Sequence, residues 1–548
     1  MVSLIASLIL SPVNILPNLT LTSSLDFQQQ GPQFGQQGRR RPPGGAPDAS
    51  AAPTAPATTP GIESMAQRDN RPDRWVQTHH SITINGQQIN YTATCGYLPV
   101  ANRDGTVQAN MFFVAYTKDG EDAHKRPITF AFNGGPGSSS VWMHMGAIGP
   151  VRAEMTYHGF MPKPPFRYTD NQESWIPFTD IVMLDAVGTG YSETVTPGDR
   201  QFYNVQGDLG AFTSAITHYV TDENRWLSPV FVAGESYGGF RVAGLSNSLL
   251  QAGVACSGII SVSGVLNFPT IDGGKDNDLP FISFLPSECG VAWYHKKLSP
   301  AMEGDLLGTI KKCEDFARGE YAHALMMGSD LSAADRDHVA AELSSYMGIS
   351  KKFILQADLR VPEFEFMGKL LADEHTSVGR YDARVTGYIE NTTRPSPDYD
   401  ASDAASSPVF TAAFNDYIKT QLKFDNPMAY KIMGGVPGWD EETSNDTSDM
   451  LRRAMTENPT MQVMFAFGRF DLACPYFGTR YVVDHMQEPA ALRSNIHFQY
   501  YPAGHMVYLD TPSRIKLQKD VMGFETGAVV GGGDPATNPD TPMSNKGN

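Results

Sequence analysis

The stretch Pro229–Gly239, PVFVAGESYGG, constrains the fold of this 548-residue chain more than any other feature. Val230–Ala233 is a short apolar run typical of a buried strand, and the residues after the stretch read as a helix. Gly-x-Ser-x-Gly between a strand and a helix indicates a nucleophile elbow, a tight turn that lifts the Ser236 hydroxyl above the sheet. Gly234 and Gly238 have no Cβ to clash in such a turn. An ordinary glycine-rich turn is the alternative, so the interpretation depends on other segments.

Other apolar segments predict a parallel sheet around this turn. Strand-like runs lie within residues 127–140, 179–193, 258–267, 461–467 and 496–510. Helix-like segments with short links alternate with several of them, which favours right-handed crossovers and parallel pairing. We therefore predict the α/β class and an α/β-hydrolase fold. Its central sheet would be mostly parallel, with helices on both faces and a helical cap insertion.

Three polar residues follow three of these strands in a meaningful order. Ser236, Asp471 and His505 occur in the chain order of the α/β-hydrolase triad. A serine hydroxyl is a poor nucleophile, so a histidine must accept its proton, and a carboxylate must orient the imidazole and stabilise its cation. Taken singly, Asp471 could cap a turn and His505 is one of 13 histidines. Their joint placement at strand ends favours catalysis.

The glycine-rich loop in FNGGPGSSS follows an early strand. Gly134 and Gly135 can present bare backbone N–H groups there, as the loop does that supplies half of an oxyanion hole in α/β-hydrolases. A phosphate-binding loop is the alternative, but the Gly-Lys-Ser/Thr ending is absent. Asp185 also ends a strand, and we interpret it as structural.

Composition divides the chain into five parts. They are a possible export signal (1–25), a disordered Gln/Gly/Pro/Ala-rich linker (26–72), an α/β-hydrolase domain in two segments (73–271 and 439–526), a mainly helical cap insertion (272–438) and a disordered tail (527–548). The linker composition cannot bury a core. The insertion has amphipathic helical segments and would cover the active site and shape the substrate pocket. A separate helical domain with no role in the site is the alternative.

Residues 1–25 hold two apolar pieces, but they lack the basic start of a signal peptide, and Pro12 interrupts them. Because a linker follows, we expect a secreted or periplasmic, cell-envelope protein with an atypical signal peptide. A cytosolic protein with a disordered N-terminus is the alternative. If the protein is exported, Cys289 and Cys313 are the expected disulfide; otherwise both are buried free thiols.

The net charge and the cysteine spacing limit the kinds of partner and cofactor that we expect. The formal net charge of −17 disfavours nucleic acids and anionic membranes. No apolar run reaches the ~18 residues of a spanning helix, so we expect no membrane span. The five cysteines form no Cys-x-x-Cys pair, so we expect no metal and no cofactor. No feature indicates an oligomeric state.

Four segments resemble the signature segments of the serine carboxypeptidases. FNGGPGSSS, GESYGG, GRFDLACPY and PAGHMVYLD are similar to that family's NGGPGCSS, GESYAG, GDxDxxCN and GAGHMVP, in the same order. DAVGTGYS resembles a shortened DQPxGxGFS. The resemblance, to a bacterial-type relative, spans about residues 95–524 apart from the insertion. It implies an α/β-hydrolase with a helical cap that removes C-terminal residues from peptides.

The resemblance also implies a role for each matching residue. Ser236 would be the nucleophile, Asp471 the orienting acid and His505 the base; Gly135 and Tyr237 would donate the oxyanion N–H groups; Asn133, Gly134 and Glu235 would bind the terminal carboxylate of the substrate.

Three positions depart from the family pattern. Ser138 stands where a cysteine usually follows GGPG, so the family's disulfide is absent there. Pro475 replaces an asparagine. Ala147 stands where the family has a glutamate, so one of the two acids that bind the carboxylate is missing.

We therefore predict a serine-type carboxypeptidase-like hydrolase that acts on peptides through an acyl-enzyme on Ser236. An esterase, an acyltransferase or another peptidase on the same fold would use the same triad, so these remain alternatives. A catalytically inactive binding protein is a further alternative, which the complete triad disfavours.

Overall fold

The structure, a computed structural model, describes residues 75–434, 436, 438–440 and 445–530. The predicted export signal (1–25) and linker (26–72) lie outside the described residues. All described residues belong to one compact unit. Among them, no helix is both long and apolar enough to cross a membrane.

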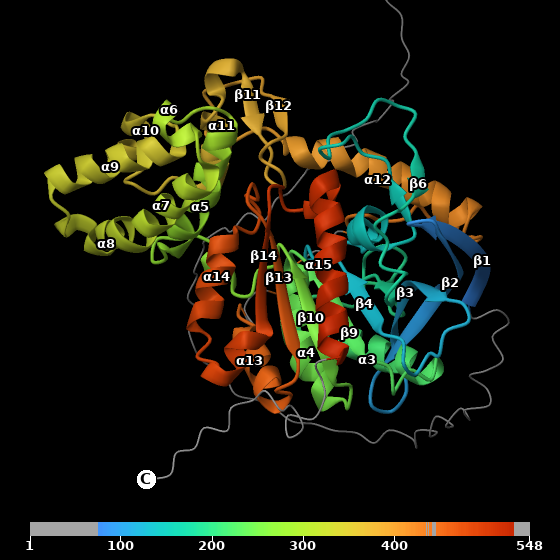
Figure 1. Cartoon of the computed structure of the whole chain (residues 1–548). Coiled ribbons are helices and arrows are strands. Elements are labelled where there is room, and N and C mark those ends of the chain that lie inside the picture. The colour runs from blue at the N-terminus through green and yellow to red at the C-terminus, as the bar shows by residue number, and fades with distance from the viewer. Residues whose placement is uncertain (1–74, 435, 437, 441–444, 531–548) are drawn as a thin grey trace, which may run out of the picture. The chain divides into compact units, whose positions relative to one another are not determined.

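A ten-stranded sheet organises this unit (Figure 1), in the order β1-β2-β3-β7-β4-β9-β10-β13-β14, with β8 paired to β3. Its strands are β1 (Trp75–Ile84), β2 (Gln87–Ala101), β3 (Val107–Lys118), β4 (Ile128–Phe132), β7 (Asp180–Leu184), β8 (Glu193–Thr194), β9 (Val230–Glu235), β10 (Cys256–Val262), β13 (Gln462–Gly468) and β14 (Ile496–Tyr501). Pairing is antiparallel from β1 to β7 and parallel from β7 to β14. The parallel half therefore brings the carboxyl ends of β4, β9, β13 and β14 to one edge.

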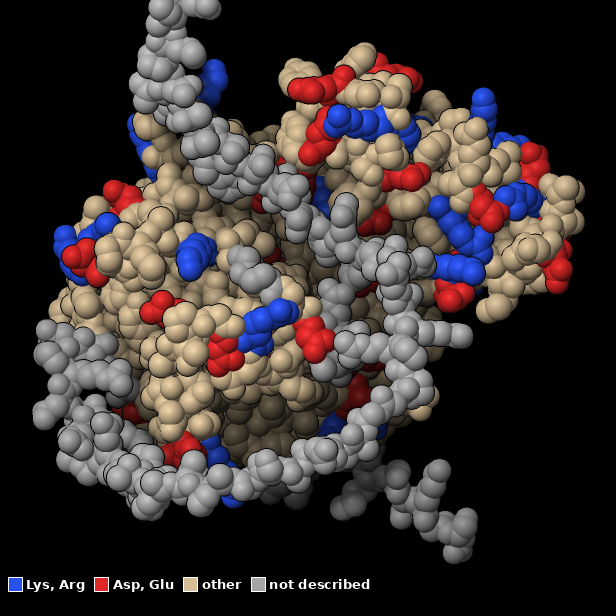
Figure 2. Space-filling model, turned by 180° about the vertical axis from the view of Figure 1, so that it is seen from behind, with Lys and Arg blue, Asp and Glu red and all other residues tan. Residues whose placement is uncertain are grey.

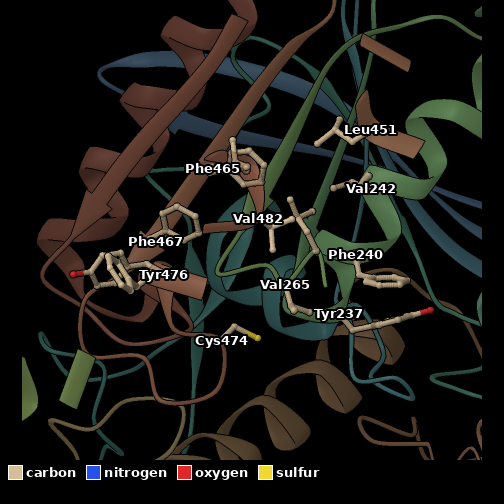
Figure 3. Packing of buried hydrophobic residues seen from close by; sticks show 14 of the residues in the cluster. Tyr237, Phe240, Val242, Val265, Leu451, Phe465, Phe467, Cys474, Tyr476 and Val482 are labelled. Carbon is tan, nitrogen blue, oxygen red and sulfur yellow. The ribbon is translucent and has the colours of Figure 1, made fainter. Parts of the chain in front are cut away.

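Helices cover both faces of the sheet. They include α3 (Val205–Asp222), α4 (Tyr237–Gln251), α12 (Ala401–Thr420), α13 (Ser448–Glu457), α14 (Tyr476–His485) and α15 (Thr511–Val530). Side chains alternate along each parallel strand, so Phe465 enters one buried cluster, whereas its neighbours Met464 and Ala466 enter the other. The first cluster includes Val242 of α4 and Leu451 of α13 (Figure 3). The second holds apolar residues of α12 and α15.

Local sequence explains where α3 begins and which face it buries. The side chain of Asn204 accepts a hydrogen bond from the Gly207 N–H at 2.8 Å, which caps the first turn. Leu209, Phe212 and Ile216, spaced at three and four residues, are all buried against the sheet.

The segment 272–438 is mostly helical, with one hairpin that the sequence did not reveal. It contains α5 (Leu279–Tyr294), α6 (Pro300–Glu303), α7 (Leu306–Phe316), α8 (Ala322–Met327), α9 (Ala333–Met347), α10 (Lys351–Gln356), α11 (Glu363–Lys369), β11 (Thr376–Val378), β12 (Thr386–Tyr388) and α12. Helices α5 to α11 lie together in Figure 1, and we call them the cap helices. Strands β11 and β12 pair antiparallel over three residues each, too short for visible alternation. By contrast, α12 packs against the sheet, and its apolar side chains belong to the second buried cluster.

The structure corrects the expected start of the C-terminal tail and decides between the two expectations for the cysteines. The tail was expected to begin at residue 527, but α15 continues to Val530. One glycine weakens a helix by about 1 kcal/mol and does not by itself end it. All five cysteines are buried free thiols, so Cys289 and Cys313 form no bridge. On the face seen in Figure 2, acidic and basic side chains are interspersed.

Candidate active site

The turn after β9 has the geometry of a nucleophile elbow. Ser236 adopts φ 63° and ψ −127°, a strained conformation for a residue with a side chain. Its N–H donates to the Val262 carbonyl at 3.1 Å, which ties the turn to β10. A Cβ on Gly234 would lie 2.2 Å from the Gly238 oxygen, so a glycine is required there. Unlike its buried neighbours, Ser236 is partly exposed and accessible to a substrate.

The structure brings Asp471 and His505 together from the loops after β13 and β14. Asp471 Oδ2 lies 2.8 Å from His505 Nδ1, and Asp471 Oδ1 accepts the N–H groups of Ala473 and Cys474 at 2.7 and 3.0 Å. These bonds fix the carboxylate and direct His505 Nε2 away from it. Burial lowers the pKa of His505, but the Asp471 carboxylate outweighs this effect, and the net pKa is raised. The pair therefore favours an imidazole that accepts a proton readily.

The hydroxyl of Ser236 faces Cys474, with Oγ 4.0 Å from Sγ. Within the described part of the chain, it makes no hydrogen bond to His505. Bonds between a nucleophile and its base often tighten only when the substrate binds. Burial raises the pKa of the Cys474 thiol, so Cys474 stays protonated and unreactive. Cys474 lies at the edge of the first buried cluster, near Tyr237 (Figure 3).

The glycine-rich loop after β4 passes directly over the elbow. A Cβ on Gly134 would meet the Tyr237 nitrogen at 2.4 Å, so a glycine is required for this approach. Tyr237 is the first residue of α4, and its N–H therefore has no acceptor within the helix. The next loop residue, Gly135, is exposed. The two backbones predicted to form the oxyanion hole are thus adjacent.

Two residues that the sequence analysis missed hold this loop in place. Arg241 of α4 donates to the Asn133 carbonyl at 2.6 Å and forms a bidentate pair with Asp208 of α3 at 2.7 and 3.1 Å. The Tyr237 hydroxyl donates to the same aspartate at 3.1 Å. All four residues are buried. An arginine five residues after the elbow serine, within an otherwise apolar helix start, is the signal that could have identified this support.

Glu235 lies beside the base, with Oε1 3.9 Å from His505 Nε2. Burial raises the pKa of Glu235 to about 7, although His505 and a hydrogen bond from Tyr508 oppose the rise. The Tyr508 hydroxyl donates to Glu235 Oε2. Asn133 Nδ2 is buried without a hydrogen bond of good geometry to a described residue, but the amide opposes the rise of the Glu235 pKa and therefore lies close to that carboxyl group. A carboxyl group that is protonated below about pH 7 and a buried amide donor therefore lie near the nucleophile.

Tyr508 also explains how the site accommodates the missing acid at Ala147. It stands in PAGHMVYLD where the family pattern has a proline, a difference that the sequence analysis overlooked. Its ring packs against Gly146, where a Cβ would come within 2.4 Å of it. A tyrosine hydroxyl thus contacts Glu235 from a ring that packs beside Ala147.

The turn between β11 and β12, residues 379–385, lies on the loops that carry Asp471 and His505. The Tyr381 carbonyl accepts the His505 N–H, and the two rings are 5.4 Å apart. The Leu472 N–H donates to the Arg380 carbonyl at 3.0 Å. We call this segment the cap turn. Figure 1 shows it reaching from β11 and β12 toward β13 and β14.

Other groups considered from the sequence lie elsewhere or are not assembled. Asp185 is buried and accepts hydrogen bonds from the Ser140 N–H and the Tyr430 hydroxyl, which suits a structural role. Among the described residues, no three histidine, cysteine or acidic side chains are grouped to hold a metal ion.

Comparisons with known proteins agree with this geometry. The family profile described as serine carboxypeptidase matches residues 84–506. Serine carboxypeptidase-like 8 of Arabidopsis thaliana is 29% identical over 29% of this chain and 36% of its own length. A pheromone-processing carboxypeptidase of Schizosaccharomyces japonicus is 25% identical over 34% of this chain and 33% of its own. The chain thus spans about a third of the length of these curated relatives.

The fold also resembles a solved structure. The structure is similar to the crystal structure of a prohormone-processing carboxypeptidase from Saccharomyces cerevisiae. The match covers 80% of this chain and 91% of that chain, with a TM-score of 0.50 and 14% sequence identity. The α/β-hydrolase fold predicted from the sequence is therefore confirmed.

Proposed function

The chain belongs to the serine carboxypeptidase family, and on this premise we propose that it is a serine-type carboxypeptidase that releases C-terminal residues from peptides. The observation that carries the proposal is the convergence of a partly exposed Ser236 with the Asp471–His505 pair. Glu235, whose pKa burial raises to about 7, lies beside His505.

In the proposed reaction, His505 Nε2 takes the proton of Ser236 as its Oγ attacks the scissile carbonyl carbon. Asp471 stabilises the resulting imidazolium through Nδ1. The N–H groups of Gly135 and Tyr237 would stabilise the oxyanion, and the close approach of the neighbouring Gly134 to the Tyr237 nitrogen supports this role. His505 then returns the proton to the leaving amine, and water hydrolyses the acyl-enzyme by the same steps in reverse.

The terminal carboxylate of the substrate would be recognised by Asn133, Gly134 and Glu235. The buried amide of Asn133 can donate to it, and Glu235 can share its hydrogen with it below about pH 7, where the Glu235 carboxyl is protonated. Tyr508 holds Glu235 from the opposite oxygen. Because a tyrosine cannot supply the second proton of a carboxylic acid pair, we expect a weaker preference for a free terminus than a two-acid site gives.

Peptide and ester turnover provides the test. We expect hydrolysis of a blocked dipeptide with a free carboxyl end, slower hydrolysis of its amide, and fluorophosphonate labelling that maps to Ser236. Turnover of a p-nitrophenyl ester without any turnover of the peptides would favour the esterase alternative. An adduct on another serine would overturn the assignment, and no adduct at all would favour an inactive binding protein.

We also propose that the protein is exported to the cell envelope or the medium. The apolar pieces of residues 1–25 and the linker composition of 26–72 support this location. Fractionation of cells that express the full chain with a C-terminal tag tests it, and recovery only in the cytosol would contradict it.

A further inference from the structure

Arg380 occupies a fixed position at the start of the cap turn, next to the catalytic loops. Its N–H donates to Asp400 Oδ1 at 2.9 Å, and its carbonyl accepts from Leu472, the residue after Asp471. Further along the turn, the Ala383 N–H donates to the Phe470 carbonyl at 3.1 Å. The backbone of Arg380 is thus anchored to the loop that carries Asp471.

The side chain of Arg380 has no acidic partner. Among the described residues, no carboxylate lies within 4.0 Å of its guanidinium, and its Nε is buried without a hydrogen bond. The fully buried arginines behave differently, since each contacts a carboxylate; they are Arg126, Arg225, Arg241, Arg384 and Arg514. Arg380 itself is partly exposed, although its Nε is buried.

The surroundings of Arg380 place it on the side of Ser236 where Cys474 lies. Leu472, which donates to the Arg380 carbonyl, lies two residues before Cys474, and the Cys474 Sγ is 4.0 Å from the Ser236 Oγ. Burial raises the pKa of Cys474, and the Arg380 cation opposes that rise. The guanidinium lies 5.6 Å from the ring centre of Phe364 in α11 and 6.0 Å from that of Tyr381. Glu363 and Asp400 act on it electrostatically from beyond ion-pair distance. They moderate its charge but leave its hydrogen-bond donors unused.

We propose that Arg380 is a specificity-determining residue that binds a carboxylate of the peptide substrate. This inference rests on the proposed peptidase function and adds an anion-binding residue to it. A planar guanidinium with unused donors suits a carboxylate, which it can bind through two parallel hydrogen bonds. Burying a cation without a partner is costly, and a substrate carboxylate would supply that partner.

Two carboxylates of a peptide could fill this role, namely an acidic side chain near the scissile bond or the free terminus. Four blocked dipeptides separate them, carrying Glu or Gln at the residue before the scissile bond, each with a free or an amidated terminus. A second set places Glu or Gln at the last residue. The variants are Arg380→Met, which keeps the length and removes the charge, and Arg380→Lys. Arg336→Met in α9 removes a charge elsewhere in the cap helices and serves as the control.

For the wild type we expect kcat/KM to be about ten- to a hundredfold higher for the preferred carboxylate over its neutral counterpart. Arg380→Met should abolish that ratio, Arg380→Lys should retain part of it, and Arg336→Met should leave it unchanged. A lost Glu-to-Gln ratio assigns Arg380 to a side chain, and a lost acid-to-amide ratio assigns it to the terminus. If Arg380→Met leaves both ratios unchanged, the proposal is overturned.

Fluorophosphonate labelling of Ser236 in each variant shows that the site is folded. If the wild type turns over no peptide, the proposed peptidase function fails, and binding then decides on Arg380. Calorimetry with Ser236→Ala and the Ser236→Ala/Arg380→Met double variant compares the affinity for the Glu and Gln peptides. The same titrations are made with free and amidated termini, and affinities for Ser236→Ala that differ neither between Glu and Gln nor between acid and amide also overturn the proposal.

Discussion

The strand-end loops of the sheet and the cap turn meet at the same site, but they are encoded in different ways. In the loops, each candidate group follows directly from a strand, as Ser236 follows β9 and His505 follows β14. The cap turn has no recognisable motif, and Arg380 and Tyr381 reach the site only because a short hairpin is docked there. From the comparison we propose that the loops determine the chemistry and the cap turn determines selectivity.

The largest expected effect comes from Ser236→Ala, which tests the role of the strand-end loops. We expect turnover to fall by about a factor of 10⁶, since the remaining groups have no nucleophile to activate. Thermal unfolding should stay close to that of the wild type, because the alanine removes only a partly exposed hydroxyl. Turnover is measured with a peptide and an ester. Retention of more than a hundredth of the activity would show that the nucleophile lies elsewhere.

The docking of the cap turn is tested by Arg384→Met. Arg384 binds Asp382 at 2.7 Å, Asp510 at 3.2 Å and the Pro502 carbonyl at 2.9 Å. Its removal breaks the ion pairs with the buried Asp510 and the partly exposed Asp382, although Ser513 and His158 still contact Asp510. Breaking a buried pair costs up to about 3–5 kcal/mol of unfolding free energy. We also expect kcat/KM to fall by roughly tenfold or more, because the contact between Tyr381 and His505 would loosen.

Arg360→Met is the matched control for that change. Arg360 forms a bidentate pair with Asp278 in the cap helices, but the pair is partly exposed. Such pairs contribute about 1 kcal/mol or less. Denaturant unfolding and kcat/KM are measured on both variants. Equal activity losses would mean that the cap turn has no special connection to the site.

The third prediction concerns the pH dependence of Glu235→Gln. For a free-acid peptide, wild-type kcat/KM should rise as His505 loses its proton and fall above about pH 7 as Glu235 ionises, by up to tenfold per unit. The two groups are 3.9 Å apart, so the limbs report the pair together. The amide donates at any pH, so the variant should lose the falling limb.

A second readout follows from the same charge. Ionised Glu235 raises the pKa of His505, so in Glu235→Gln the rising limb should move to lower pH. Profiles of kcat/KM against pH for a free-acid and an amidated peptide are compared, with Glu525→Gln, a buried acid on α15, as the control. If the wild-type profiles of the two peptides coincide, Glu235 does not recognise the carboxylate.

Much of the fold and the candidate chemistry could be predicted because the signals are local. The strand-turn-helix pattern around Ser236 and the chain order of Asp471 and His505 need only short segments and their sequence order. The bond between Tyr508 and Glu235 joins residues 273 positions apart. No local periodicity encodes such a contact, and the departure at Ala147 predicted a gap without showing what fills it.

The cap turn was unpredictable for a related reason. Strands of three residues are too short to show an alternating pattern, and their docking depends on contacts with loops about a hundred residues away in the sequence. Nothing in the amino-acid sequence around Arg380 distinguishes it from an ordinary surface arginine. Its interest comes from the absence of an acidic partner among the described residues, which only the assembled structure reveals.

The smallest expected effect comes from Tyr508→Phe. The hydroxyl of Tyr508 donates to Glu235 and opposes the rise of its pKa, so its removal should raise the pKa of Glu235 further above about 7. A hydrogen bond to a charged group contributes about 1.5 kcal/mol, which corresponds to roughly one pH unit. The falling limb for free-acid peptides should therefore move to higher pH by about that amount, while the profile for amidated peptides changes little. Tyr501→Phe is the matched control, because this tyrosine donates to Asp520 of α15 at 2.6 Å and not to Glu235. A limb that stays in place, or moves to lower pH, would show that Tyr508 merely fills space beside Gly146.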